Sequence, residues 1–167
     1  RSAKEDFEFA KDGYKQGIYT KRWGPNVDSQ VCGHGIIAAI ELYKCTLDSY
    51  YIDVAATYAK IVLACQQSDT PDWDIPLRGF FYEDPNHKWM LTYEHRGHEQ
   101  SPVQGLAMLC EVASNHPDYE AWINGLKLYR EYVLDSMKLT KPYGLVPGHV
   151  YVLDKLNSDR FTIPASY

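Results

Sequence analysis

The densest group of side chains that could do acid–base or hydrogen-bonding chemistry lies between residues 94 and 100. It consists of Glu94, His95, Arg96, His98, Glu99 and Gln100 around Gly97. Ser101 and Pro102 follow directly, and these residue types favour the N-cap and the first turn of a helix. A helix N-terminus stabilises carboxylates and attracts hydroxyl-rich ligands. Glu99 is therefore the candidate catalytic carboxylate, although capping of the helix by this side chain is the simpler interpretation.

Three further side chains of this group, His95, Arg96 and His98, are candidate substrate-binding residues. The two histidines lie three positions apart, and both could bind zinc. A zinc site needs at least a third protein ligand at suitable spacing, and the sequence offers none. Hydrogen bonding to a substrate or to the loop itself is the preferred interpretation. We expect neither a metal nor a cofactor.

Aromatic side chains are concentrated in two long segments, 17–28 and 68–100. They are Tyr19, Trp23, Trp73, Phe80, Phe81, Tyr82, Trp89 and Tyr93. Loops longer than about 12 to 15 residues are more often functional than accidental. Flat aromatic faces beside carboxylates suit sugar rings, so Trp23, Trp89 and Tyr93 are the candidate stacking surfaces for a carbohydrate substrate. For any single aromatic residue, packing against its own domain is about equally expected.

These loops lead into two copies of one arrangement, a pair of helices joined by a tight turn. The first copy runs over residues 29–67 and the second over 101–138, with Leu42 and Leu109 in equivalent places. Because one such pair cannot bury its apolar face alone, repeated pairs stack and share a core. The sequence therefore predicts an all-α fold of stacked antiparallel α-hairpins.

The two helices of each copy differ in their apolar pattern. The first helix of each pair, over 29–46 and 101–114, is apolar on most sides, which predicts an inner, buried helix. The second, over 49–67 and 118–138, has one apolar stripe and one polar face, which predicts an outer helix. Since the turns within the pairs are short, both long loops must lie at the opposite end and reach the same face.

An earlier helix opens the chain. Ser2 and Glu5 have the spacing of a capping box, and one face carries Ala3, Phe7, Ala10 and Tyr14. We interpret it as an outer helix without its inner partner.

Composition excludes several classes of function. The chain has 167 residues, is 45% hydrophobic and 23% charged, and carries a formal net charge of -5. The sequence has no cluster of Lys and Arg of the kind that binds nucleic acid. No apolar run approaches the roughly 20 residues needed to span a membrane. The four cysteines lie beside apolar residues without CxxC spacing, so we expect reduced packing residues.

Several stretches resemble a known superfamily. Residues 36–51 read IIAAIELYKCTLDSYY and resemble the A-x-E-L-Y-x-x-T-G-D-x-x-Y hairpin of six-hairpin glycosidases, which are built as an (α/α)6 barrel. Further similarity to bacterial proteins near glycoside hydrolase family nine lies in 77–82, 95–99, 115–119 and 142–147. The resemblance implies a partial (α/α)6 barrel and a glycoside hydrolase acting on poly- or oligosaccharides. It spans most of residues 30–151.

Two departures limit what the resemblance implies. Family-nine enzymes use an aspartate pair in a D-A-G-D motif and a glutamate near the C-terminus, and neither motif is found here. Six hairpins would also need roughly 400 residues. We expect residues 1–167 to be a single segment of a larger barrel domain, inactive by itself, with the remainder of its own barrel as partner. The expected location is periplasmic or extracellular, with any signal outside this segment.

Three other functions stay open. A helical-barrel sugar epimerase would use histidines as acid and base near an arginine, which His95, Arg96 and His98 could provide. A polysaccharide lyase would need an activated tyrosine or histidine and an acidic substrate. A non-enzymatic helical module that binds a protein on its loop face also fits, because a fold does not fix a function.

Overall fold

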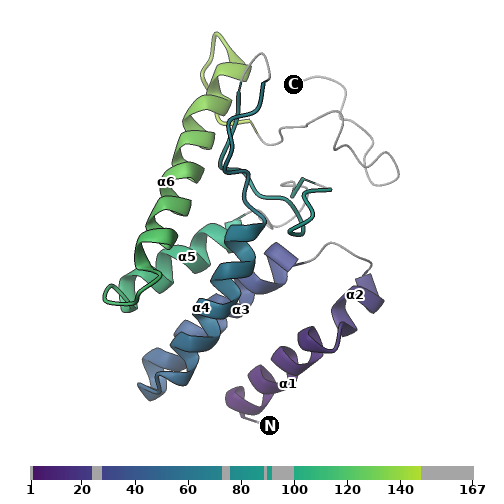
Figure 1. Ribbon diagram of the computed structural model, residues 1–167, viewed down its shortest axis with the longest axis vertical. Coiled ribbons are helices and arrows are strands. Elements are labelled where there is room, and N and C mark those ends of the chain that lie inside the picture. Colours follow the sequence, from purple (N-terminus) through teal and green to yellow (C-terminus); the bar gives the residue numbers. More distant parts are fainter. Residues whose placement is uncertain (1, 24–27, 73–75, 89, 92–99, 148–167) are drawn as a thin grey trace.

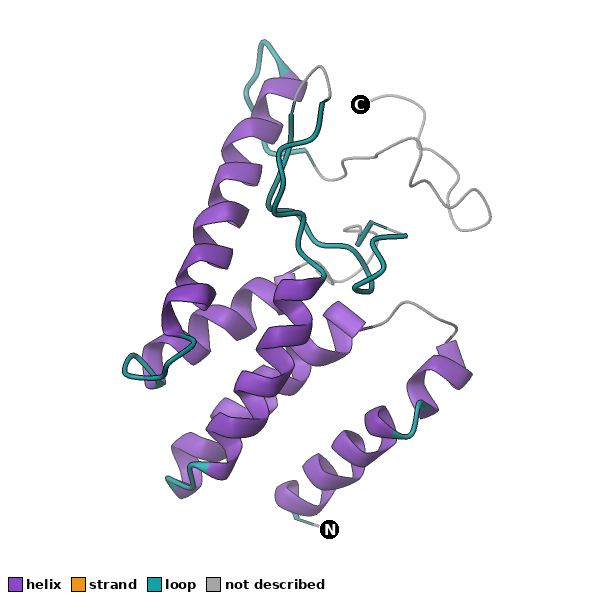
Figure 2. Cartoon of the chain, in the orientation of Figure 1, coloured by secondary structure: helices purple, strands orange, loops and turns teal. Residues whose placement is uncertain are grey.

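The computed structural model describes residues 2–23, 28–72, 76–88, 90–91 and 100–147 (Figure 1). Helices dominate these ranges (Figure 2), where only two isolated β-bridges, Gln66 with Phe81 and Tyr82 with Met90, interrupt the loops. The helices are α1 (Ala3–Lys15), α2 (Ile18–Trp23), α3 (Asp28–Thr46), α4 (Tyr50–Ala64), α5 (Gln100–Val112), α6 (Tyr119–Ser136) and a 3-10 turn, η1 (Met137–Thr140). The all-α prediction is confirmed for the described part of the chain.

The two predicted hairpins are present. α3 and α4 are joined by residues 47–49, and α5 and α6 by residues 113–118. Both turns lie at the same end of the helices, whereas the long connection after α4 begins at the other end (Figure 1). α3 is the central element, because it packs along both α4 and α5. The hairpins therefore stack side by side through their inner helices.

Glycines bring the two inner helices close together. A Cβ atom built on Gly33 of α3 would lie 2.6 Å from the carbonyl carbon of Ser101, and one built on Gly105 would lie 2.9 Å from the carbonyl oxygen of Gly33. The inner helices thus meet backbone to backbone at the start of α5. Around this contact lies the hydrophobic core, with Ile36 and Leu106 fully buried.

The predicted difference in burial between inner and outer helices holds only in the second hairpin. α5 contains five buried residues in 13 and α6 four in 18, but α3 and α4 contain six each, in 19 and 15 residues. The physical reason is α1, which covers α4: the Phe7 ring meets Tyr51 and the Tyr14 ring meets Tyr58, with centroids 5.6 and 5.8 Å apart. One flank of α3 stays open.

The start of α1 has the predicted capping box. The Ser2 amide donates to Glu5 Oε2 at 2.8 Å, and the Glu5 amide donates to Ser2 Oγ at 3.4 Å. Capping of this kind stabilises a helix by about 1 kcal/mol. On the polar side of α1, Lys11 donates to both Glu8 and Tyr50, which ties the helix to the start of α4.

Candidate functional site

The residues selected from the sequence fall almost entirely outside the described ranges. Glu99, Trp89, Tyr93, His95, Arg96 and His98 lie outside the residues that the structure describes. Trp23 is the last residue of α2, and its side chain is also outside the description. Their grouping in one cleft therefore stays a prediction. The described residues on either side show where the loop that contains these residues begins and ends.

The second long loop is anchored at the N-terminal ends of the inner helices. The backbone amide of Ser29, in the first turn of α3, donates to the carbonyl oxygen of Glu83 at 3.0 Å. Beside it, the Ser101 hydroxyl donates to the carbonyl oxygen of Gln30 at 3.4 Å, so α5 starts next to the start of α3. The described part of this loop thus lies at the end opposite the short turns, as the sequence predicts.

Most described aromatic residues of this loop belong to the core. Phe80 and Phe81 are fully buried, and Tyr82 is 3% exposed. Phe80 packs edge-on against Tyr132 of α6, and Tyr82 donates to Gln67 Oε1 at 2.9 Å. These three rings hold the loop on the helices and offer no surface to a sugar. For Phe80, Phe81 and Tyr82, packing against the chain's own helices is therefore the correct interpretation.

Hydrogen bonds to backbone carbonyls fix the same loop on α6. The buried amide of Gln66 donates from Nε2 to the carbonyl oxygens of Gly79 and Gly125, at 2.8 and 2.9 Å. Arg78 also donates from Nε to Glu131 Oε2 at 2.9 Å. These contacts hold the described part of the loop against α6.

Asp28 is a carboxylate at this loop face that the structure describes. It begins α3, and Tyr14 of α1 donates its hydroxyl to Asp28 Oδ1 at 2.7 Å. Burial, with Cys32 and Asp28 nearby, raises the pKa of Tyr14 well above its ordinary value, so the phenol stays a donor. Sequence spacing does not bring Tyr14 and Asp28 together, because they belong to different helices.

Asp84 has a structural role instead. Its side chain is 4% exposed and accepts the amide of Asn86 at 2.7 Å, which closes a turn in the loop. Glu83, 7% exposed, supplies the backbone carbonyl that receives Ser29. Neither carboxylate faces solvent, so neither is a candidate for binding a bulky substrate.

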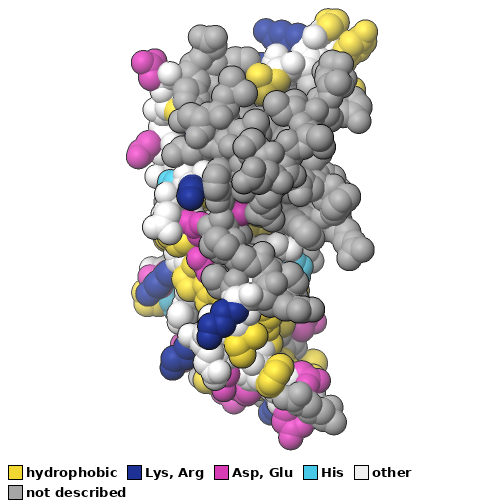
Figure 3. Space-filling model, turned by 90° about the vertical axis from the view of Figure 1, so that its right-hand side faces the viewer, with side chains coloured by type: hydrophobic (Ala, Val, Ile, Leu, Met, Phe, Trp, Pro, Cys, Tyr) yellow, Lys and Arg dark blue, Asp and Glu magenta, His cyan; other side chains and the backbone are white. Residues whose placement is uncertain are grey.

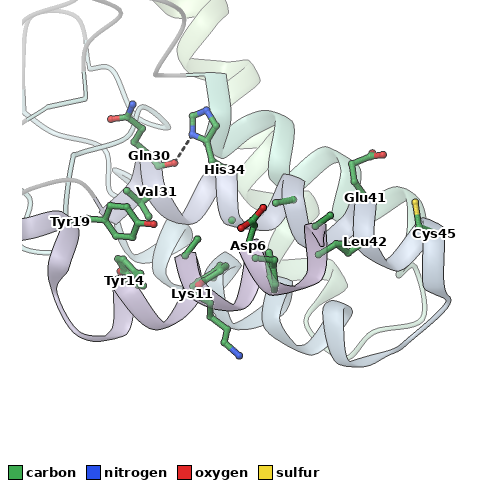
Figure 4. Close-up of a pocket in the computed structure, with 16 residues that line it drawn as sticks. Asp6, Lys11, Tyr14, Tyr19, Gln30, Val31, His34, Glu41, Leu42 and Cys45 are labelled. Atoms are coloured by element: carbon green, nitrogen blue, oxygen red, sulfur yellow. Dashed lines mark hydrogen bonds between the residues drawn. The ribbon is translucent and has the colours of Figure 1, made fainter. Parts of the chain in front are cut away.

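An open groove of about 1060 Å³ lies between α1 and α3 (Figure 4). Apolar side chains dominate its walls, and Gln30, His34 and Glu41 stand along α3. His34 Nδ1 lies 2.9 Å from the carbonyl oxygen of Gln30, one turn earlier. This groove was not predicted from the sequence, although polar residues at spacings of four and seven inside an apolar helix indicate a face that is not fully buried. In Figure 3 apolar side chains also reach the surface among charged ones.

Other kinds of site are not seen among the described residues. Within those ranges no group of three or more His, Cys, Asp or Glu side chains is placed to hold a metal ion. No described helix is both long enough and apolar enough to cross a bilayer. No protein-family model, curated protein or solved structure matches this chain.

Proposed function

We propose that this chain is a segment of a glycoside hydrolase acting on poly- or oligosaccharides, and that it supplies substrate-binding loops of a helical barrel. The observation that carries the proposal is the placement of the long loop. Its described part meets the N-terminal end of α3 through the Ser29–Glu83 hydrogen bond, on the side away from the hairpin turns, and α5, which follows the loop in sequence, starts beside α3. In a closed ring of such hairpins, this face would collect the loops of every repeat around one central opening.

A second observation supports the resemblance to six-hairpin glycosidases. Leu47 has φ of 56°, a left-handed conformation that glycine adopts without strain. The hairpin motif that residues 36–51 resemble has glycine at this place. The Leu47 amide donates to the carbonyl oxygen of Tyr43, as in a helix that ends on a left-handed residue. The turn geometry is thus the one that the motif's glycine would favour.

The proposed roles follow from side-chain chemistry. Trp23, Trp89 and Tyr93 stack on the apolar faces of sugar rings, and His95, Arg96 and His98 donate hydrogen bonds to hydroxyls or carboxylates. Glu99, next to the N-terminus of α5, is the candidate carboxylate. Inverting hydrolysis needs a second carboxyl group about 6.5 to 9.5 Å away, with water between them. We place that partner in another part of the barrel.

The experiment compares Glu99→Gln and Arg96→Ala with the unmodified intact protein. We expect each variant to lose about ten- to hundredfold in hydrolysis or oligosaccharide affinity, the range for one hydrogen bond to a charged group. Loss of a positioned acid or base would cost about a hundredfold to ten-thousandfold. The melting temperature should stay nearly unchanged.

Matched controls lie on the outer helix α6. Glu120→Gln, near the turn between α5 and α6, and Arg130→Ala make the same chemical changes at exposed positions of α6. They should leave activity and affinity unchanged. If the two loop variants also keep full activity and affinity on every glycan tested, the cluster from 94 to 100 only caps and packs, and the proposed site is wrong.

A further inference from the structure

His34, in the second turn of α3, presents one ring nitrogen to solvent in a defined chemical state. Its Nδ1 atom lies 2.9 Å from the carbonyl oxygen of Gln30. A carbonyl oxygen only accepts hydrogen bonds, so Nδ1 carries a proton, and in the neutral ring Nε2 is then an acceptor. The side chain is exposed, and within the described ranges no hydrogen bond to Nε2 is seen. α3 therefore holds an oriented acceptor for a hydrogen-bond donor of a ligand.

The bond to Gln30 also places this ring beside the start of α5. The same carbonyl oxygen accepts the Ser101 hydroxyl at 3.4 Å, so His34 and Ser101 are bound to one atom. The backbone of Gly33, next to His34 in sequence, packs closely on Ser101, because an added Cβ atom would lie 2.6 Å from its carbonyl carbon. Ser101 stands two positions after Glu99 in the sequence. His34 thus lies on the inner helices at the point where the candidate sugar-binding loop joins α5.

Two other side chains that suit a sugar lie at the same end of the groove. Figure 4 shows Tyr19, Gln30 and His34 at one end of it, with Cys45 at the other. Tyr19 belongs to α2, within the first aromatic segment of the sequence, and is half-buried, as is Gln30. An aromatic ring with an amide and an imidazole nearby offers one stacking face and several hydrogen-bonding atoms. This combination matches the apolar face and the hydroxyl groups of a sugar ring.

The charges of the groove disfavour an acidic sugar. Asp6 and Glu41 line the groove with carboxylates. Lys11 also lines it, but its amine points away (Figure 4) and donates to Glu8. In its neutral form His34 Nε2 cannot bind a carboxylate oxygen, since both atoms are acceptors. A hydroxyl group, which can donate, is the matching partner.

We propose that this end of the groove, formed by Tyr19, Gln30 and His34, is a subsite for a neutral sugar unit, in which His34 Nε2 accepts a hydrogen bond from a hydroxyl group. The inference rests on the proposed glycosidase function. It adds to that function a binding site on the inner helix, outside the long loops, and a substrate class, uncharged glycans. His34 orients the sugar in this site and is assigned no proton transfer.

Two substitutions separate the bond to the sugar from the bond to Gln30. His34→Asn keeps an N–H group close to the position of Nδ1 and has no atom at the position of Nε2, whereas His34→Gln places its amide close to Nε2. We expect His34→Asn to weaken the binding of a neutral hexasaccharide about tenfold, since the sugar hydroxyl loses its partner. His34→Gln should weaken it about threefold or less, because the amide oxygen can accept instead. Both variants should keep the melting temperature, since the side chain is exposed.

The affinities are measured by titration calorimetry on the intact protein. The neutral probes are cellohexaose, xylohexaose and mannohexaose, and the acidic probe is hexagalacturonic acid. We expect at least one neutral probe to bind about tenfold or more tightly than the acidic one, because like charges in a site oppose binding. Thr57→Val is the matched control: Thr57 also donates to the carbonyl oxygen four residues earlier, at 2.9 Å, on the exposed face of α4. This variant should bind every probe as the unmodified protein does.

The outcomes distinguish this inference from the proposed function. If the protein binds and cleaves a neutral hexasaccharide and His34→Asn does so equally well, the subsite is wrong and the glycosidase proposal stands. Equal losses in His34→Asn and His34→Gln would assign the effect to packing and overturn the subsite, as would a preference for hexagalacturonic acid. If the protein neither binds nor cleaves any glycan tested, both proposals are wrong.

Discussion

At the level of one residue, Leu47 holds backbone strain in the turn between α3 and α4. It is 77% exposed and adopts φ of 56°, so its side chain makes little compensating contact. A non-glycine residue in this region costs about 1 to 2 kcal/mol. We expect Leu47→Gly to raise the free energy of unfolding by up to about 1 kcal/mol, after allowance for the greater freedom of glycine in the unfolded chain. Denaturant titration measures this change.

The matched control for this prediction is Leu134→Gly. Leu134 is also an exposed leucine, 49% accessible, but it lies within α6. Glycine there should lower the stability by about 1 kcal/mol. The two substitutions thus differ in sign. A loss of stability in Leu47→Gly equal to that of the control would contradict the strain at the turn.

The buried Cys32 thiol makes the free energy of unfolding depend on pH in the alkaline range. Burial, with Asp28 nearby, raises the pKa of its thiol from the ordinary 9.0 to about 12, against a hydrogen bond from Tyr14 that lowers it. Because the folded protein holds the neutral thiol, this contribution is complete below pH 9 and is lost as the pH rises towards 12. The free energy of unfolding should fall in this window by up to about 1.4 kcal/mol per pH unit for this group.

Removing the thiol tests that assignment. Tyr58 contributes to part of the same window, because burial, with Cys32 nearby, raises the pKa of its hydroxyl to about 12. In Cys32→Ala the free energy of unfolding should therefore fall less steeply with pH in the alkaline range, but it should still fall. The cavity left by the missing thiol lowers the stability at every pH and does not change this slope. Urea titrations at several pH values between 8 and 11 measure the slope. Equal slopes in the variant and the unmodified protein would be inconsistent with a buried Cys32 thiol of raised pKa.

At the scale of the elements, the crossing of α3 and α5 holds the two hairpins together. Gly33 lies where an added Cβ atom would meet the backbone of Ser101 and Pro102 at 2.6 and 2.7 Å. Backbone cannot yield as a flexible side chain does, so Gly33→Ala must push the inner helices apart. We expect a loss of about 2 to 4 kcal/mol of stability, measured by chemical denaturation.

Gly13→Ala is the control for the close contact between α3 and α5 at Gly33. Gly13 is also buried within a helix, but its nearest neighbour would be Tyr19 at an ordinary 3.6 Å. Alanine there should leave stability unchanged or raise it by up to about 1 kcal/mol, since alanine is the better helix former. If Gly33→Ala behaves in the same way, the inner helices are not in backbone contact and the stacked arrangement needs revision.

Apolar periodicity predicted the described elements well because each helix has a distinct pattern. One polar face was predicted for the helix over 49–67, and Asp53, Thr57 and Lys60 of α4 form such an exposed face. For the loop aromatics, Phe80 and Phe81 form part of the core, whereas the side chains of the candidates Trp23, Trp89 and Tyr93 lie outside the described part of the structure and their role stays a prediction. Sequence spacing cannot show whether a loop folds back onto its helices, because that depends on contacts with distant residues such as Tyr132 and Gly125. The groove beside α3 was missed for the same reason.

At the scale of the whole molecule, the described helices form a stack of two hairpins with α1 beside it. Two hairpins share the α3–α5 contact, and α1 adds a third outer helix beside an open groove. The loop face lies at the N-terminal ends of the inner helices, where backbone N–H groups favour polar and anionic ligands. The resemblance to six-hairpin glycosidases joins these features into one proposal: a ring of hairpins with its substrate site among the loops.

The most direct measurement is the product formed by the intact protein on a panel of oligo- and polysaccharides. A glycoside hydrolase releases new reducing ends in amounts that grow with time, and Glu99→Gln should slow their release while Glu120→Gln does not. An epimerase would instead yield an isomer without cleavage, and a lyase would yield unsaturated products that absorb in the ultraviolet. Either of these products, or no change in any glycan together with no binding, would contradict the account.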